Sequence, residues 1–434
     1  MKIKQVLATG AALSMALSMA PVTESAADKV DINVIAAQYG QQTADWWANF
    51  VTEFNEANPD INLNVEVVSW NDIYTVVNTR IANGEAPDVL NIDVFADYQA
   101  DDLLLPIQDV VSEETYSKMY DAFLAQSEVD GTVWAIPDLA SARAMYYNKD
   151  ILDKAGIDPS TLTSPDAIKE AFETIDSKKD ELGLTAVVGY AAEPVNLYWS
   201  TGNHLFGTYL DEGLDRDDTT YIDMLNDGGK LDEGRFTDFA KFVGLLNQYS
   251  DPALLVSGTY DQQILNFSSG KYAFVTQGSW IGATMVGDDA DAYKEAGNFE
   301  VGMIPYAFED GQDTILTSSP SWWSVYKDGN VEAAEAFLQW LTTDEAQEVL
   351  VKEAGFVSPF KSCTIVGDDP FAQTITDYQK AEKTSAWHWS IPGFKEGIAQ
   401  NYTGQVFADY ASGSLDEAGF VKTMQQVLES AYAN

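Results

Sequence analysis

Seven tryptophans beside turns are the side chains whose chemistry stands out in this sequence. The chain has 11 tryptophans, and those that lie next to turns are Trp70, Trp199, Trp280, Trp322, Trp323, Trp387 and Trp389. An indole stacks on the C–H face of a sugar ring, while Asp, Asn, Gln and Arg side chains bond the hydroxyl edge. The set therefore predicts carbohydrate binding, with packing in a hydrophobic core as the alternative for each indole taken singly.

The stretch 270–280, GKYAFVTQGSW, places one of these indoles at the end of a strand. A turn at Gly270 precedes a short apolar strand, and Gly278-Ser279 then leads to Trp280. A glycine lets a ligand approach the backbone, and the neighbouring indole offers its flat face. We expect Trp280 to bind the ligand, and the alternative is a core tryptophan that follows a turn.

Signatures of catalysis are weak throughout the chain. The two histidines, His204 and His388, are far apart, and no histidine or cysteine has the spacing of zinc ligands. The stretch 278–282, GSWIG, is similar to a nucleophile elbow, but its serine stands one position early. We expect no catalytic residue, no metal and no cofactor. With 68 acidic residues, a carboxylate pair that acts on a glycosidic bond stays an alternative.

The net charge of −44 limits the kinds of molecule that we expect to bind this protein. Such a surface repels nucleic acid and acidic polymers. The stretch 215–218, DRDD, comes closest to a calcium loop, but it lacks the glycine and the distal glutamate. The single cysteine, Cys363, excludes an internal disulfide, which fits bacterial export better than eukaryotic secretion.

Residues 1–27 have the pattern of a secretory signal peptide. Two lysines precede an apolar stretch of Ala, Leu and Met, Pro21 breaks it, and small residues follow at 25–27. The apolar stretch is too short for a membrane span. We expect a mature chain from Asp28, without a lipid anchor because no cysteine lies near the cleavage site.

Strands and helices alternate at the start of the mature chain. Apolar or alternating stretches predict strands at 32–37, 61–68 and 89–94, and helical stripes follow the first two of them. This order predicts a parallel α/β sheet, in which ligands lie outside the carboxyl ends of the strands. The loops expected on that rim are 38–42, 70–71 and 93–98.

The second half of the chain also contains predicted helices and strands. Ser164-Pro165 caps a predicted helix that carries Ile168 and Phe172, and 186–192 reads as a strand. Ser414 and Glu417 have the spacing of a capping box at the start of a final amphipathic helix.

Four stretches of the chain together resemble one protein family. They are 54–67 (FNEANPDINLNVEV), 142–158 (ARAMYYNKDILDKAGID), 270–280 (GKYAFVTQGSW) and 321–347 (SWWSVYKDGNVEAAEAFLQWLTTDEAQ). In order and spacing they are similar to the extracellular solute-binding proteins of ABC transporters, in the sugar-binding branch that includes maltose-binding protein.

The resemblance implies a type II periplasmic-binding-protein fold of class α/β. Each of two lobes is then a mostly parallel sheet flanked by helices, with a hinge between them. Lobe one is expected at 28–140 and 312–361, and lobe two at 141–311 and 362–434. The hinge crossings are expected near Ser141 and Gly311.

The resemblance also implies binding positions, but no catalytic ones. They are Gln38 and Tyr39 after the first strand, Asp93 after the third, Ser141 and Arg143 at the first crossing, Trp280, Trp322 or Trp323, and Trp387 or Trp389. Trp70 and Trp199 are added because they stand in predicted loops.

The leading hypothesis is a non-enzymatic periplasmic protein that captures a sugar or oligosaccharide between its lobes. It would act as a monomer and deliver the solute to the membrane permease subunits of an ABC importer. The alternatives are the same fold with a non-sugar solute and a secreted enzyme that acts on polysaccharide. The 24 Lys and Arg residues argue against phosphorylated or polycarboxylate solutes.

Overall fold

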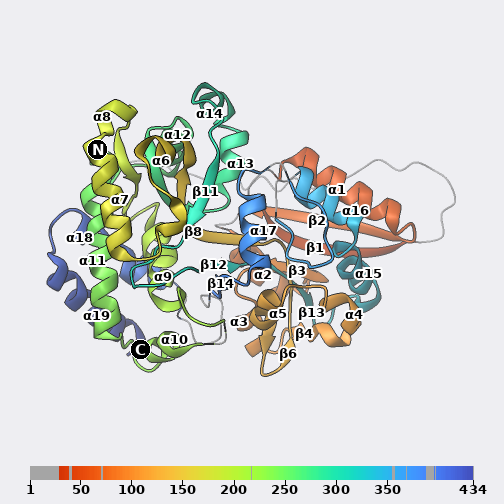
Figure 1. Cartoon of the computed structure of the whole chain (residues 1–434). Coiled ribbons are helices and arrows are strands. Elements are labelled where there is room, and N and C mark those ends of the chain that lie inside the picture. The colour runs from red at the N-terminus through yellow and green to blue at the C-terminus, as the bar shows by residue number, and fades with distance from the viewer. Residues whose placement is uncertain are drawn as a thin grey trace, which may run out of the picture.

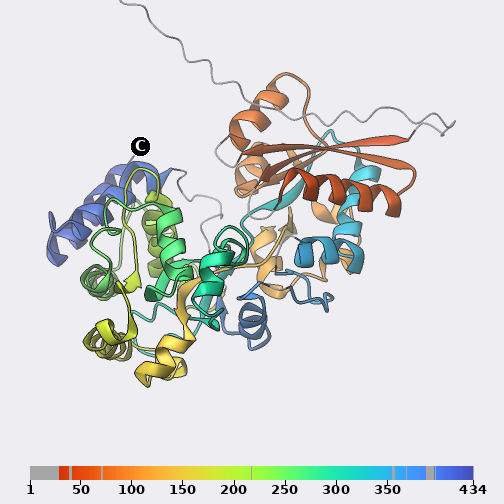
Figure 2. The same cartoon turned by 90° about the horizontal axis from the view of Figure 1, so that it is seen from above.

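Two lobes lie side by side, each built around its own six-stranded sheet (Figures 1 and 2). The computed structural model describes residues 29–38, 42–69, 72–216, 218–353, 357–367, 369–387, 395 and 397–433. The predicted α/β class with two lobes is confirmed. The predicted signal peptide lies outside the described residues. Among the described residues, no helix is both long and apolar enough to span a bilayer.

The sheet of the first lobe has the order β2-β1-β3-β13-β4, with β7 also paired to β13. Its strands are β1 (Val30–Gln38), β2 (Ile61–Ser69), β3 (Val89–Ile92), β4 (Leu104–Leu105), β7 (Ile136–Pro137) and β13 (Trp322–Tyr326). The predicted parallel pairing of the first three strands is confirmed. β13 runs antiparallel to β3, because the chain returns to this lobe from the other one.

The sheet of the second lobe has the order β14-β12-β8-β10-β9, with β11 also paired to β8. Its strands are β8 (Ser141–Asn148), β9 (Ala186–Gly189), β10 (Tyr272–Gly278), β11 (Val301–Ile304), β12 (Ile315–Ser318) and β14 (Thr384–Ser385). The expectation of a mostly parallel sheet is confirmed, since β9, β10, β11, β12 and β14 run in the same direction. β8 enters from the first lobe and is antiparallel to β10, β11 and β12.

Three chain segments meet where the lobes join. The first is 138–141, between β7 of the first-lobe sheet and β8 of the second-lobe sheet. The second is 319–321, between β12 and β13, and not the region of Gly311, because β12 pairs with β8 in the second lobe. The third is at Val357, whose carbonyl accepts the Ala140 N–H at 2.8 Å.

The helices of the first lobe cover both faces of its sheet (Figure 1). They are α1 (Ala44–Ala57), α2 (Ile73–Ala82), α3 (Phe95–Ala100), α4 (Glu113–Tyr116), α5 (Asp121–Ser127), α15 (Val331–Leu341) and α16 (Asp344–Glu348). The Thr43 side chain caps α1, and Phe50 and Phe54 on its buried face pack against Phe337 and Trp340 of α15. The predicted loop at 93–98 is largely helix α3.

The second lobe carries the other helices of the described residues. They are α6 (Lys149–Ala155), α7 (Pro165–Ser177), α8 (Lys179–Leu182), α9 (Phe206–Asp211), α10 (Thr220–Asn226), α11 (Glu233–Tyr249), α12 (Tyr260–Ser268), α13 (Ile281–Val286), α14 (Ala290–Glu295), α17 (Ala372–Lys380), α18 (Gly404–Ala411) and α19 (Glu417–Tyr432).

Short helical segments occur in both lobes. The 3-10 and π-helical segments are η1 (Ile107–Asp109), η2 (Pro159–Thr161), η3 (Ser200–Leu205), η4 (Val349–Glu353) and η6 (Ala399–Thr403). A two-stranded hairpin comprises β5 (Glu128–Val129) and β6 (Thr132–Val133).

Two predicted caps had different outcomes. The Ser164 side chain accepts the Ala167 N–H and Pro165 opens α7, as predicted. The final helix α19 is also confirmed, but its predicted cap is wrong. Asp416, and not Ser414, accepts the Gly419 N–H at 2.8 Å, because the helix starts directly after Asp416.

Candidate functional site

Five aromatic side chains of the second lobe form one contiguous cluster, which we call the aromatic wall: Trp199, His204, Tyr260, Trp280 and Trp387. The His204 ring lies 4.9 Å from that of Trp280 and 5.5 Å from that of Trp387, between ring centroids. Trp199 lies 6.3 Å from Trp280 and 6.0 Å from Tyr260. Three of the predicted tryptophans are thus brought together from distant parts of the chain.

Trp280 stands two residues beyond the end of β10, at the start of α13, and is half-buried. Its indole folds back over Gly278, where a Cβ atom would lie 2.0 Å from the ring. The glycine therefore makes room for the indole itself, and not for the ligand as the sequence suggested.

Trp199 and His204 are positioned by the π-helical segment η3 (Ser200–Leu205). The Trp199 indole N–H donates to the Asn196 carbonyl at 2.9 Å, which fixes the ring. His204 was not among the binding residues that the sequence predicted. It stands five residues after Trp199, and the two rings meet because η3 is π-helical, which no pattern in the sequence predicts.

Trp387 packs on α9 and on the buried Arg143. A Cβ atom at Gly207 would lie 2.5 Å from the Trp387 ring nitrogen, so only glycine admits the indole at this distance. The Arg143 guanidinium carbon lies 3.3 Å from the centroid of the Trp387 ring and 5.7 Å from that of Trp280. This geometry places a cation against the face of an indole, a favourable arrangement.

Arg143 links the aromatic wall to the hinge. Its Nη1 donates to the Ser141 hydroxyl at 3.1 Å and to the Ser318 hydroxyl at 2.8 Å, and Ser141 in turn donates to the Ser318 carbonyl. No carboxylate of the described residues lies within ion-pair distance of Arg143. Burial lowers the pKa of Arg143 to about 9, so the side chain stays charged at neutral pH.

Several buried polar atoms around the aromatic wall lack a hydrogen-bond partner among the described residues. They are Arg143 Nε, Thr201 Oγ1, His204 Nδ1 and Gln277 Oε1. Burial, together with the positive charge of Arg143, lowers the pKa of His204 well below its usual value. His204 is therefore neutral, with one ring nitrogen as a donor and the other as an acceptor. A buried polar atom without a partner is costly, so these atoms are suited to a ligand or to water.

The rim of the first lobe carries two of the predicted positions. Asp93 follows β3 and accepts a hydrogen bond from the Tyr74 hydroxyl of α2, which also accepts the Val94 N–H. Burial and the Asp93 charge raise the pKa of Tyr74 well above its usual value, so Tyr74 stays protonated. Gln38 is exposed at the end of β1 and donates to the Gln42 carbonyl.

Trp322 and Trp323 lie in the core of the first lobe, each 1% exposed. As neighbours on β13 they point to opposite faces of the sheet. Trp322 packs against Phe95 and Phe123, and Trp323 packs against Phe337. Neither indole presents a face to solvent, so the binding role expected for them does not fit this arrangement. Tyr39, Trp70 and Trp389, also predicted, lie outside the described residues.

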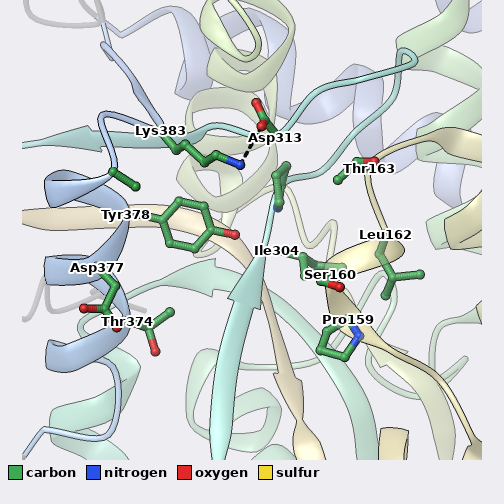
Figure 3. A pocket seen from close by; sticks show the side chains of 12 residues that line it. Pro159, Ser160, Leu162, Thr163, Ile304, Asp313, Thr374, Asp377, Tyr378 and Lys383 are labelled. Carbon is green, nitrogen blue, oxygen red and sulfur yellow. Dashed lines mark ion pairs between the residues drawn. The ribbon is translucent and has the colours of Figure 1, made fainter.

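A separate cavity of about 290 Å³ opens between α17, the turn at 159–163 and β11 (Figure 3). Lys383 and Asp313 form an ion pair of 2.8 Å at its edge, and Tyr378 donates to the Met303 carbonyl. It contains no member of the aromatic wall, so it is not part of the candidate site. No cluster of three potential metal ligands occurs among the described residues.

The raised pKa values of three buried carboxyl groups predict how the stability of the folded protein depends on pH. Burial raises the pKa of Asp138, in the first crossing, from an ordinary 3.8 to about 7, although Trp323 and Ser321 donate to it. Burial also raises the pKa of Asp369 to about 7 and of Glu212 to about 8. These groups hold their protons more tightly in the folded state. Their contribution to stability is therefore greatest in acid, declines as the pH rises above the ordinary pKa of about 4, and is lost by pH 7 to 8.

We expect the melting temperature to be higher at pH 5 than at pH 8, and Asp138→Asn to reduce that difference. The asparagine keeps an acceptor for the Trp323 N–H but cannot ionise. Differential scanning calorimetry across this range checks both expectations. A melting temperature that rises steadily from pH 5 to pH 8 would contradict the pKa directions.

Comparisons with known proteins agree with the fold and the motifs. The pattern that describes the bacterial extracellular solute-binding protein family matches residues 39–348. A binding protein of Brucella abortus is 33% identical over 135 residues, and the chain spans about a third of its length, 33%. The match to the sn-glycerol-3-phosphate-binding periplasmic protein UgpB of Agrobacterium fabrum is 25% identical and covers 58% of this chain and 56% of that one.

Longer matches extend over most of the chain. The multiple sugar-binding protein of Streptococcus mutans is 22% identical over 407 residues, 87% of each chain. Among solved structures, the Bacillus subtilis binding protein msme, in an open conformation, superposes with a TM-score of 0.72. That match has 17% identity and covers 94% of this chain and 98% of the other, so it shows the shared fold. Because the family pattern covers more than half of the sequence, the chain belongs to the bacterial extracellular solute-binding proteins.

Proposed function

We propose that this protein captures a sugar or oligosaccharide between its two lobes and delivers it to an ABC importer, without chemical change. The observation that carries the proposal is the aromatic wall, with unpaired buried polar atoms beside it. Indole faces match the C–H face of a sugar, and the polar atoms match its hydroxyl groups. The name of the Streptococcus mutans relative supports a sugar as the solute.

Capture would couple to lobe closure. A solute that contacts the aromatic wall and the rim around Asp93 makes more contacts when the lobes approach each other. It therefore favours the closed form by the difference in binding free energy between the two forms. The permease subunits would then recognise the closed protein, acting as a monomer.

Thermal shift and calorimetric titration with a panel of neutral mono- and oligosaccharides test this proposal. A solute at one hundred times its Kd stabilises the folded state by about 2.7 kcal/mol, which is a readily measured shift. Chromatography of the sugar after incubation tests the alternative of an enzyme. Hydrolysis products would contradict a pure binding role, and a panel without any shift would contradict sugar capture.

A second candidate is a solute that carries an anionic group. The buried, uncompensated charge of Arg143 is the observation that favours it, and the UgpB relative bears the name of a phosphorylated solute. Uronic acids and glycerol 3-phosphate therefore belong in the same panel. Stabilisation by these anions but by no neutral sugar would favour the second candidate over the first.

We also propose that the protein is exported and works in the periplasm, with Asp28 at its N-terminus and no lipid. The pattern of 1–27 and the lack of a cysteine near 27 support this. We expect the intact mass of the exported protein to equal that of residues 28–434. A diacylglycerol adduct, or retention of 1–20, would contradict the proposal.

A further inference from the structure

A cavity of about 630 Å³ borders the aromatic wall beyond Trp199. Its lining comes from two segments of the chain, 193–199 and 256–261. The volume falls in the range of about 300 to 1,000 Å³ that is typical of pockets for small molecules. Two members of the aromatic wall, Trp199 and Tyr260, thus line this cavity as well.

The walls of this cavity are held in place before any ligand arrives. The Glu193 carboxylate accepts the backbone N–H groups of Val195, Asn196 and Leu197 at 2.6 to 3.1 Å, which fixes one wall. The other wall, residues 256–261, packs closely against Leu254, because a Cβ atom at Gly258 would lie 2.3 Å from the Leu254 side chain. A preformed cavity loses little entropy on binding.

Trp199 connects this cavity to the rest of the aromatic wall. One part of the indole contacts Trp280 and His204, and its N–H is bonded to the cavity wall at Asn196. Successive ring centroids from Trp387 to Tyr260 are 4.9 to 6.3 Å apart, and neighbouring rings are inclined by 49 to 71° to each other. The aromatic wall therefore extends over several ring widths, with faces inclined to one another rather than in one plane.

The lining of the cavity suits the uncharged hydroxyl edge of a sugar. Leu197 and Val256 supply apolar surface, and Ser257 and Thr259 supply hydroxyl groups. Glu193 and Asp261 bring negative charge, which disfavours an anionic group at this end.

We propose that the solute is an oligosaccharide of at least three units, running from Arg143 along the aromatic wall and over Trp199. Its uncharged far end occupies the cavity between 193–197 and 256–261. This inference rests on the proposed function and adds the length of the solute and the location of its far end.

Calorimetric titration tests the proposed length of the solute. The ligands are sugars of one to five units from the malto-, cello-, xylo- and chito- series. We expect affinity in the recognised series to increase up to at least three units. Ser257→Trp should fill the cavity, and since Ser257 is exposed the change should leave the fold intact. It should weaken binding of chains of three or more units about tenfold or more, with little effect on one or two units.

Ser177→Trp is the matched control, because Ser177 is an exposed serine of the same lobe at the end of α7. It should bind every length as the unaltered protein does. Equal affinity for two-unit and longer chains, or an equal loss for short and long chains in Ser257→Trp, would overturn the inference and leave sugar capture standing. Absence of binding by every sugar at every length would overturn both.

Discussion

Replacing Trp280 by alanine should weaken sugar binding by ~1–3 kcal/mol, the free energy of burying a large apolar side chain. This corresponds to a Kd ~5- to 150-fold higher. Trp280 lies at the centre of the aromatic wall, in contact with Trp199 and His204 and near Arg143. Because it is half-buried, a stacked sugar should also shift its fluorescence.

Calorimetric titration and thermal melting of the same variant separate binding from folding. Trp134→Ala is the matched control, since Trp134 is also half-buried but lies in the first lobe, outside the aromatic wall. It should leave affinity unchanged. Trp280→Phe should recover part of the lost affinity, because it keeps an aromatic face. An unchanged Kd with a lowered melting temperature in Trp280→Ala would assign the indole to the core.

Replacing Trp323 by alanine should have a large effect of a different kind, a loss of ~3–5 kcal/mol in the free energy of unfolding. The indole is 1% exposed, packs on Phe337, and donates to Asp138 at 3.1 Å. Its removal would create a cavity and take a hydrogen bond from a buried carboxyl group. Urea denaturation measures the loss.

Trp323→Phe distinguishes packing from the hydrogen bond. It retains most of the buried ring but removes the N–H, so it should be less destabilising than alanine. Sugar affinity of the folded protein should stay unchanged in both variants, because Trp323 is enclosed by the first lobe. A variant with unaltered stability and a many-fold weaker affinity would restore the binding role that the sequence suggested.

The class of fold and most local structure follow from patterns in the amino-acid sequence. Periodicity identified β1, α1, β2 and α2, since a half-buried strand and an amphipathic helix repeat their apolar residues at different periods. The motifs around Trp280 and Tyr147 pointed to the family that the comparisons show. Local capping chemistry gave the start of α7, but two nearby candidates at the start of α19 were not separable without the backbone.

Which tryptophans line the candidate site depends on long-range packing and not on local sequence. Trp280 and Trp323 both stand beside turns, and their immediate neighbours in sequence do not differ in a way that reveals burial. Trp323 is buried because α15, formed by the residues after its strand, covers that face of the sheet. Trp280 remains half-exposed because it lies beyond the end of β10, where no strand continues.

His204 and Arg143 show the same limit. Their roles arise from contacts with Trp280 and Trp387, which lie far from them along the chain. The second crossing likewise depends on β12 pairing with β8, a long-range choice that the sequence of 312–321 does not express. Local patterns determine periodicity and caps, whereas burial and proximity depend on which distant segments pack together.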